Sequence, residues 1–189
     1  MSKNIVILAS GNGSLAQAII DSSESIGAKV LAVITDNPSA YVLERARKAS
    51  IPTQIIEMKS DRNAWDADLL ALLRMLSADL VVSAGFMRIL SPACVEEFRI
   101  INSHPALLPM YPGAHAVRDA LADGATQTGT TIHWVDSGVD TGPIIAQENV
   151  EISPSDTEAT LHERIKIVER RLYVETLRKL LPTLESANV

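Results

Sequence analysis

The first 85 residues alternate between short apolar runs and segments with helical spacing, and this alternation constrains the fold most strongly. The apolar, β-branched runs span 4–10, 28–36, 52–58 and 79–85. The segments with helical spacing span 15–27, 40–50 and 63–78. Continuous apolar runs are typical of strands buried on both faces of a parallel sheet. The alternation therefore predicts right-handed βαβ units in an α/β, doubly wound, mostly parallel sheet of Rossmann-like type.

The second half of the chain changes this pattern. Two strands are expected at 130–136 and 143–152 with no helix between them, which predicts an antiparallel strand in the C-terminal half. Residues 156–181 have the pattern of one long closing helix, with Ser155 or Asp156 as its N-cap. With 189 residues and 47% hydrophobic content, the chain can bury one full core, so we expect a single domain over 1–189.

Composition and charge argue against several classes of partner. The formal net charge is −6 and no basic run occurs, which argues against nucleic acid. The apolar run at 4–10 is too short for a signal peptide core or a membrane span, so we expect a cytoplasmic protein with no membrane partner. The single cysteine, Cys94, cannot form an internal disulfide or a Cys-rich zinc site. The histidines between 104 and 133 lack the spacing of zinc ligands, so we predict no metal.

A glycine loop, "SGNGSLAQ" at 10–17, follows the first expected strand. Gly11, Gly13 and Ala16 fit the G-x-G-x-x-A pattern. Asp36 ends the second strand, where the ribose-binding acid of a dinucleotide site would lie. The same loop suits a single phosphate, because it presents backbone N–H groups at a helix N-terminus. A dinucleotide, a phosphorylated metabolite and a turn without a ligand all remain open.

A polar pair ends another apolar run, in the stretch "INSHPALLP". Strand periodicity places Asn102 and His104 on one side and makes Ser103, on the other, a spacer. An amide can donate to a developing oxyanion, and a protonated imidazole can donate or supply a proton. Asp140, if close to His104, would favour the charged imidazole, whereas Asp136 better suits capping of its turn. The alternative to a catalytic role is that Asn102 and His104 are a hydrogen-bonded polar pair in the core.

The remaining histidines are weaker candidates. His133 alternates with Ile132 and Trp134, so a substrate contact and core packing are equally compatible with it. His115 lies in "YPGAH" without a further signal. We expect His162, on the closing helix, to lie on a solvated face.

Five motifs together resemble the phosphoribosylglycinamide formyltransferase family. They are, in order, "SGNGS", "GFMRILSP", "NSHPALLPMYPGAH", "GTTIHWVDSGVDTGPII" and "IKIVERRLY", and they cover essentially the whole chain. The resemblance implies the formyltransferase version of the fold, with a phosphate-binding N-terminal half and a folate and catalytic C-terminal half. It implies transfer of a formyl group from 10-formyltetrahydrofolate, as co-substrate, to the amine of 5-phosphoribosylglycinamide (glycinamide ribonucleotide) in de novo purine (IMP) biosynthesis. Both partners are small molecules, and a homodimer is compatible with this reading.

The resemblance also implies roles for individual residues. The implied catalytic residues are Asn102, His104 and Asp140. The implied contacts to the phosphorylated substrate are Gly13, Ser14, Leu15, Lys166 and Glu169. The implied folate contacts are Arg62, Met87, Arg88, Ile89, Leu90, Asp136 and Val139, with His115 and His133 supporting the site. The chain departs from the family pattern at Leu15, commonly Asn, at Ser103, usually aliphatic, and at Ala106, usually Ser.

Four alternatives explain less of the sequence. Methionyl-tRNA formyltransferase normally adds an RNA-binding domain, for which this chain is too short and too acidic. Formyltetrahydrofolate hydrolase normally begins with a regulatory domain, whereas here the first strand begins at Asn4. A dinucleotide-dependent oxidoreductase and a non-catalytic nucleotide-binding module both leave Asn102, His104 and Asp140 without a function.

Overall fold

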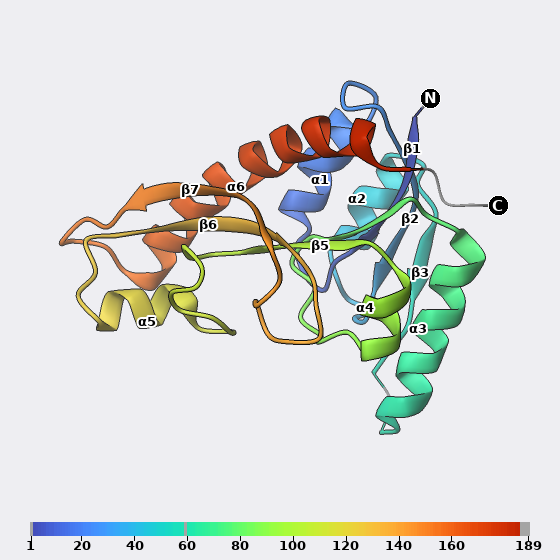
Figure 1. Ribbon diagram of the computed structural model, residues 1–189, viewed down its shortest axis with the longest axis horizontal. Coiled ribbons are helices and arrows are strands. Elements are labelled where there is room, and N and C mark those ends of the chain that lie inside the picture. Colours follow the sequence, from blue (N-terminus) through green and yellow to red (C-terminus); the bar gives the residue numbers. More distant parts are fainter. Residues whose placement is uncertain (1, 59, 186–189) are drawn as a thin grey trace.

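One sheet organises the chain, of which the computed structural model describes residues 2–58 and 60–185. Within these residues seven strands lie in the order β3-β2-β1-β4-β5-β6-β7 (Figure 1). The strands are β1 (Lys3–Leu8), β2 (Ala28–Thr35), β3 (Thr53–Ile55), β4 (Leu80–Ser83), β5 (Ile100–His104), β6 (Gln127–Trp134) and β7 (Ile144–Glu151). The helices are α1 (Ser14–Ser22), α2 (Val42–Lys48), α3 (Arg62–Leu76), α4 (Pro92–Glu97), α5 (Ala116–Ala122), α6 (Glu158–Leu180) and the 3₁₀ turn η1 (Leu181–Thr183).

The strand directions confirm the predicted mostly parallel sheet. All pairings from β3 to β5 are parallel. β6 runs antiparallel to both β5 and β7, so the antiparallel part extends one pairing further than expected. The chain builds outward from β1 to β3 and then returns to add β4 on the other side of β1. Ligands bind at such a reversal of strand order, beyond the carboxyl ends of the strands.

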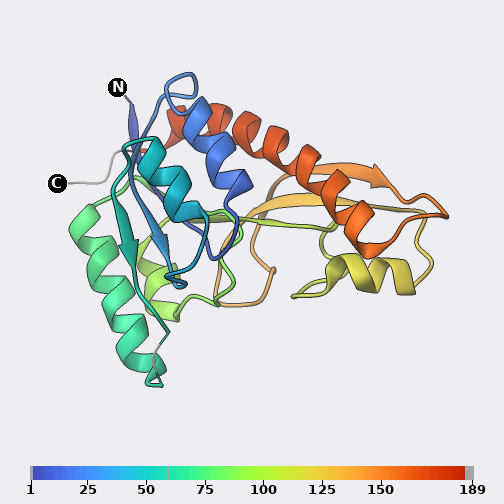
Figure 2. The ribbon, with the colours of Figure 1, turned by 180° about the vertical axis from the view of Figure 1, so that it is seen from behind.

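Helices cover both faces of the sheet, with α1, α2 and α6 on one face and α3 and α4 on the other (Figures 1 and 2). Along β1, Ile5 and Ile7 face the first group, and Val6 and Leu8 face the second. All four side chains are fully buried. Burial of such a side chain contributes about 1.5–3 kcal/mol, which explains why β1 is apolar at every position.

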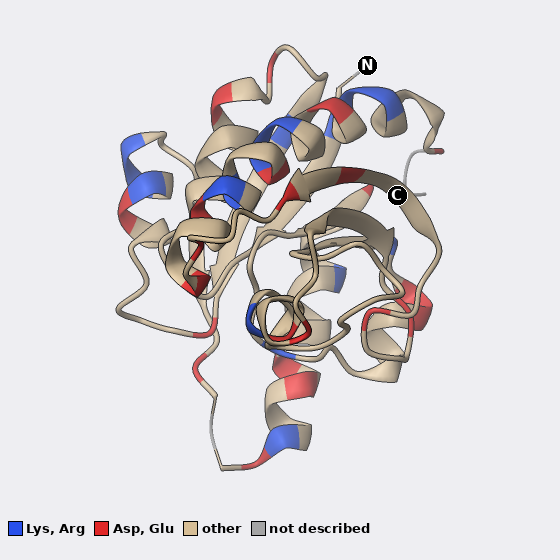
Figure 3. Cartoon of the chain, turned by 90° about the vertical axis from the view of Figure 1, so that its left-hand side faces the viewer, with Lys and Arg blue, Asp and Glu red and all other residues tan. Residues whose placement is uncertain are grey.

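The long helix α6 begins later than the sequence indicates. Thr157 is its N-cap and forms a capping box with Thr160, so the prediction of Ser155 or Asp156 is wrong. Asp156 is otherwise engaged, since its carboxylate binds Arg164 at 2.7 Å. Figure 3 shows basic and acidic residues interspersed along the helices on this side of the molecule. Two exposed pairs of this kind, Arg171–Glu148 and Arg171–Glu175, contribute little stability individually.

Short elements account for the other differences from the sequence-based expectation. The helix expected over 15–27 ends at Ser22, and a turn leads to Gly27, which has a φ of 69°. Helices α4 and α5 were not expected from the sequence, because six or seven residues are too few for a clear helical period. Ser91 caps α4 by accepting a hydrogen bond from the Cys94 N–H.

Candidate active site

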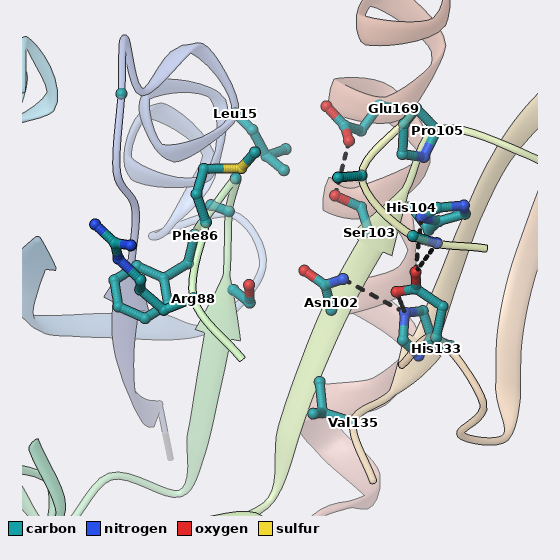
Figure 4. Close-up of a pocket in the computed structure, with 18 of the residues that line it drawn as sticks. Leu15, Phe86, Arg88, Asn102, Ser103, His104, Pro105, His133, Val135 and Glu169 are labelled. Carbon is teal, nitrogen blue, oxygen red and sulfur yellow. Dashed lines mark hydrogen bonds and ion pairs between the residues drawn. The ribbon is translucent and has the colours of Figure 1, made fainter. Parts of the chain in front are cut away.

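A cavity of about 520 Å³ lies at the carboxyl ends of β1, β4 and β5, where the strand order reverses. The glycine loop and the 84–90 loop after β4 line one side, and the end of β5 lines the floor. The 135–140 segment and α6 complete the walls (Figure 4). The cavity therefore joins segments from both halves of the chain at the position expected for a ligand in this fold.

Pairing of β5 with β6 gathers the predicted catalytic side chains. Asn102 lies directly opposite His133 in the antiparallel register, so both side chains share one face. Their Nδ2 and Nε2 atoms are 3.4 Å apart. Asp140, from the loop after β6, places Oδ2 at 3.2 Å from His104 Nδ1 and Oδ1 at 3.5 Å from His133 Nε2. Asp140 therefore lies close to His104, and His133 connects Asp140 with Asn102.

Both ring nitrogens of His104 face oxygen acceptors. Nε2 lies 2.7 Å from the carbonyl oxygen of Tyr111, opposite the Asp140 contact at Nδ1. Both contacts are hydrogen bonds only when each ring nitrogen carries a proton, as in an imidazolium. Tyr111 and Asp140 both have left-handed backbone angles, with φ of 53° and 55°. Strained non-glycine residues of this kind concentrate at functional sites.

Asp140 is held as a carboxylate. Burial raises its pKa. The hydrogen bond from His133, the Gly113 N–H at 2.9 Å and the charge of His104 together lower the pKa by more than burial raises it. The net result is a pKa below the ordinary value. A negative charge therefore stays beside the two histidines at neutral pH.

His133 connects Asn102 with Asp140. Its Nδ1 donates to the carbonyl oxygen of Trp134 at 2.8 Å, which fixes the ring. In the neutral form Nε2 accepts from Asn102, and in the protonated form it donates to Asp140. The Asn102 amide nitrogen carries two N–H groups, so one can bind His133 while the other serves a ligand in the cavity.

The glycine loop is shaped by residues of α2. Arg45 donates through Nε to the Asn12 carbonyl oxygen and through Nη2 to the Asn12 side chain, both at 2.8 Å. Gly13 has a φ of 75°, and a Cβ there would lie 2.4 Å from Val42. Leu15 is only 4% exposed and packs in the core. Because the Leu15 side chain is apolar and buried, only the backbone N–H at this position, which departs from the family pattern, is available to a phosphate.

An apolar rim surrounds the other end of the cavity. Met87, Ile89 and Val139 line the cavity, although they are 70%, 63% and 49% exposed. Leu90 is buried beside them. Exposed apolar side chains at a cavity mouth are typical of a site for a large, partly apolar ligand.

The predicted folate residues with polar side chains differ in their positions. Arg62 is not among the lining residues, but its Nη2 donates to the carbonyl oxygen of Ile89. The guanidinium of Arg88 binds Asp36 at 2.6 Å and points away from His104 (Figure 4). This pairing occupies Oδ2 of the carboxylate that a dinucleotide ribose would need, and the other oxygen, Oδ1, is buried. Asp136 lines the cavity and caps its turn as predicted, accepting from the Gly138 N–H and the Thr141 hydroxyl.

Two side chains that the sequence analysis set aside, those of Ser103 and His162, line the cavity. Ser103 is not merely a spacer, because its hydroxyl donates to Glu169 Oε1 at 2.7 Å (Figure 4). His162 does not lie on a solvated face, since it lines the cavity on the same face of α6 as Lys166 and Glu169. The spacing of 162, 166 and 169 was the signal that could have found it. His115 is exposed and lies outside the lining, next to Ala114, which belongs to it.

Within residues 2–58 and 60–185, no group of three or more His, Cys, Asp or Glu side chains is arranged to hold a metal ion. Of the helices in this described part of the chain, none is long and apolar enough to cross a membrane.

The fold and the site agree with comparisons to known proteins. The formyl transferase family matches residues 3–177. Phosphoribosylglycinamide formyltransferase of Mycobacterium tuberculosis is 47% identical over 93% of this chain and 84% of its own length. The Escherichia coli enzyme of that name is 44% identical over 90% and 83%. The crystal structure of glycinamide ribonucleotide transformylase 1 from Symbiobacterium toebii has a TM-score of 0.90 at 40% identity, covering 94% and 86%.

The chain therefore belongs to the formyl transferase family. Within that family it belongs to the phosphoribosylglycinamide formyltransferases, which are one-carbon transferases.

Proposed function

We propose that Asn102, His104 and Asp140 carry the transfer of a formyl group from 10-formyltetrahydrofolate to the amine of 5-phosphoribosylglycinamide. The products are the N-formyl ribonucleotide and tetrahydrofolate, in de novo purine biosynthesis. The observation that carries this proposal is the cluster itself: an amide, an imidazole between two acceptors and an ionised carboxylate share one cavity. Neither a dinucleotide oxidoreductase nor a passive binding module uses such a set.

The two ends of the cavity suit the two substrates. The backbone N–H groups of Gly13, Ser14 and Leu15, together with Lys166, hold the substrate phosphate, while Glu169 accepts from the amine side. The segment 87–90, through the apolar side chains of Met87, Ile89 and Leu90, and Val139 hold the pteridine ring of the folate, with Arg62 near its tail. His115 and His133 support the site. Both substrates then reach the cluster from opposite directions, which brings the amine and the formyl carbon together.

No protein nucleophile is needed for the chemistry. The neutral amine attacks the formyl carbon, and the C=O electrons move to oxygen, giving a tetrahedral oxyanion. Asn102 donates to this oxyanion, and His104 donates through Nε2 when the oxyanion replaces the Tyr111 carbonyl oxygen as its acceptor, while Asp140 stays on Nδ1. The C–N bond to the folate then breaks, and the proton lost by the attacking amine reaches the leaving folate nitrogen, with Asp140 assisting through water. Binding of the remote phosphate contributes to orientation.

Hydrolysis of the formyl folate is the nearest competing reaction, because water could take the place of the amine. The test is an assay of tetrahydrofolate release from 10-formyltetrahydrofolate, with and without glycinamide ribonucleotide. Amine-dependent turnover supports the transferase. Turnover that is equal without the amine, or no turnover with both substrates, would contradict it.

Other properties belong to the same proposal. We infer one domain over 1–189, with phosphate binding in its N-terminal half and folate binding and catalysis in its C-terminal half. A cytoplasmic location is supported by the single free, buried thiol of Cys94, since a lack of disulfides is typical of reducing compartments. No metal, nucleic acid or membrane is required by the chemistry. A homodimer is a prediction that light scattering on the purified chain would test.

A further inference from the structure

We propose that Ser103 is a positioning residue that acts through Glu169: its hydroxyl holds the Glu169 carboxylate in place to receive the amine of the phosphorylated substrate. This inference rests on the proposed function and adds a residue to it. Nothing in the family pattern implies it, because the position between Asn102 and His104 is usually aliphatic there.

The geometry of β5 makes this contact possible. Successive side chains on a strand point to opposite sides, so Ser103 leaves the sheet on the side away from the His104–Asp140 pair. On that side it meets α6, where its Oγ lies 2.7 Å from Glu169 Oε1 (Figure 4). Asn102 and His104 therefore lie on one side of β5, and Ser103 lies on the other side, against α6.

The contact leaves one oxygen of Glu169 for a ligand. Oε1 receives the Ser103 hydroxyl, and in the described part of the chain no hydrogen bond is formed to Oε2. Glu169 and Ser103 both line the cavity, as does Lys166 one turn earlier on α6. A carboxylate oxygen beside the phosphate-binding lysine suits a ligand that carries an N–H donor near its phosphate.

The hydroxyl also affects the charge of Glu169. Burial raises the pKa of this carboxyl, while the Ser103 hydrogen bond and the charges of Lys166 and Arg170 lower it. Tyr173 lies one turn further along α6, and burial and the charge of Glu169 raise the pKa of its hydroxyl. Lys166, Arg170 and Tyr173 all belong to α6, the helix of Glu169 itself. Ser103 is the group that β5 places against the Glu169 carboxylate. Loss of its hydroxyl removes a donor from a carboxyl that burial already pushes toward its neutral form.

The experiment compares four variants with the unmodified chain: Ser103→Ala, Ser103→Thr, Glu169→Gln and the double variant Ser103→Ala/Glu169→Gln. Ser103→Ala is expected to raise the KM for glycinamide ribonucleotide about tenfold, as for loss of a hydrogen bond to a charged group, with the KM for the folate unchanged. Its kcat should stay within about twofold, because no reacting atom is touched. Ser103→Thr keeps a hydroxyl and should restore the KM.

Two further readouts separate positioning from a general structural effect. The acidic limb of kcat/KM for the ribonucleotide should move to higher pH in Ser103→Ala, because Glu169 then protonates more readily. In the Glu169→Gln background, Ser103→Ala should add little, because the hydroxyl binds a neutral amide oxygen more weakly than a carboxylate. A carbon-13 NMR titration of the Glu169 carboxyl gives the same coupling without turnover.

Several outcomes would overturn the proposal. These are an unchanged KM in Ser103→Ala, an equal rise in the KM for the folate, a full additional loss in the double variant, or an unchanged Glu169 titration. If the unmodified chain shows no amine-dependent turnover, the proposed function fails and this proposal fails with it. Normal turnover of the unmodified chain with any of the four outcomes rejects the role of Ser103 alone.

Discussion

The Oδ2 atom of Asp140 lies 3.2 Å from Nδ1 of His104, although the two residues are 36 positions apart and belong to different structural elements. His104 ends a buried strand, whereas Asp140 lies in a loop with a left-handed backbone angle. The imidazole is also held at Nε2 by the Tyr111 carbonyl oxygen. The ring is therefore oriented before any substrate binds, which is the condition for effective stabilisation of a developing charge.

Asp140→Asn preserves the shape of this contact and removes its charge. We expect kcat to fall by about 10²–10⁴-fold, the range for loss of proton-transfer assistance, with little change in either KM. Steady-state kinetics with both substrates would check this. Asp119→Asn, an exposed carboxylate beside Arg118, is the matched control and should leave kcat unchanged. Equal rates for the two variants would contradict the role of Asp140.

Asn102→Ala and His104→Ala each remove a proposed donor to the oxyanion. Each should lower kcat by at least about 10²-fold. Thermal melting should show that both variants remain folded, because both side chains lie at the cavity rather than in the clusters that pack the sheet. Near-normal turnover of both folded variants would reject the proposed mechanism.

The lowered pKa of Asp140 predicts a pH dependence of stability. Folding favours its carboxylate over its neutral form, so ionised Asp140 adds stability above its ordinary pKa of 3.8. This contribution is lost as the pH falls through the lower pKa of the folded state. Urea unfolding of the unmodified chain and Asp140→Asn should therefore differ most at neutral pH and converge only at a pH below the ordinary value of 3.8. A difference that grows on acidification would show that the sign is wrong.

Arg45 holds the glycine loop through Asn12, far from the catalytic cluster in the chain. Arg45→Ala should loosen the loop and raise the KM for glycinamide ribonucleotide about fivefold, the loss of about 1 kcal/mol of binding. The KM for the folate should not change. Arg47→Ala is the control, since Arg47 is exposed on the same helix and pairs only with Glu44 among the described residues. Steady-state kinetics of the two variants would show whether the Arg45–Asn12 hydrogen bonds affect binding of the ribonucleotide.

Gly13 and Gly11 occupy the same loop but tolerate a side chain differently. Gly13→Ala places a Cβ against Val42 at a φ of 75°, so we expect a loss of about 1–3 kcal/mol of unfolding free energy. Gly11→Ala meets no atom within 4 Å and should stay within about 0.5 kcal/mol. Chemical denaturation measures both. Equal stability of the variants would show that the contact with Val42 relaxes freely.

Some parts of the site could be predicted because they depend on local pattern. Strand alternation placed Asn102 and His104 on one side, and the turn chemistry of Asp136 was readable from its neighbours. The role of Ser103 could not be read in this way, because its partner Glu169 is 66 residues away on α6. His162 was misassigned although its spacing with Lys166 and Glu169 was readable, because only the fold shows which side of α6 faces the cavity.

The sequence by itself determined the alternation of strands and helices in the first half of the chain, the long closing helix, the doubly wound class and the chemical character of the strand ends. It did so because buried strands and amphipathic helices impose periods of two and 3.6 on the chain. The tertiary structure alone decided which polar groups meet: Asp140 with His104, His133 with Asn102, and Ser103 with Glu169. These contacts depend on sheet register and on the rotation of α6 about its axis. Both arise from packing of the whole core and not from the local sequence.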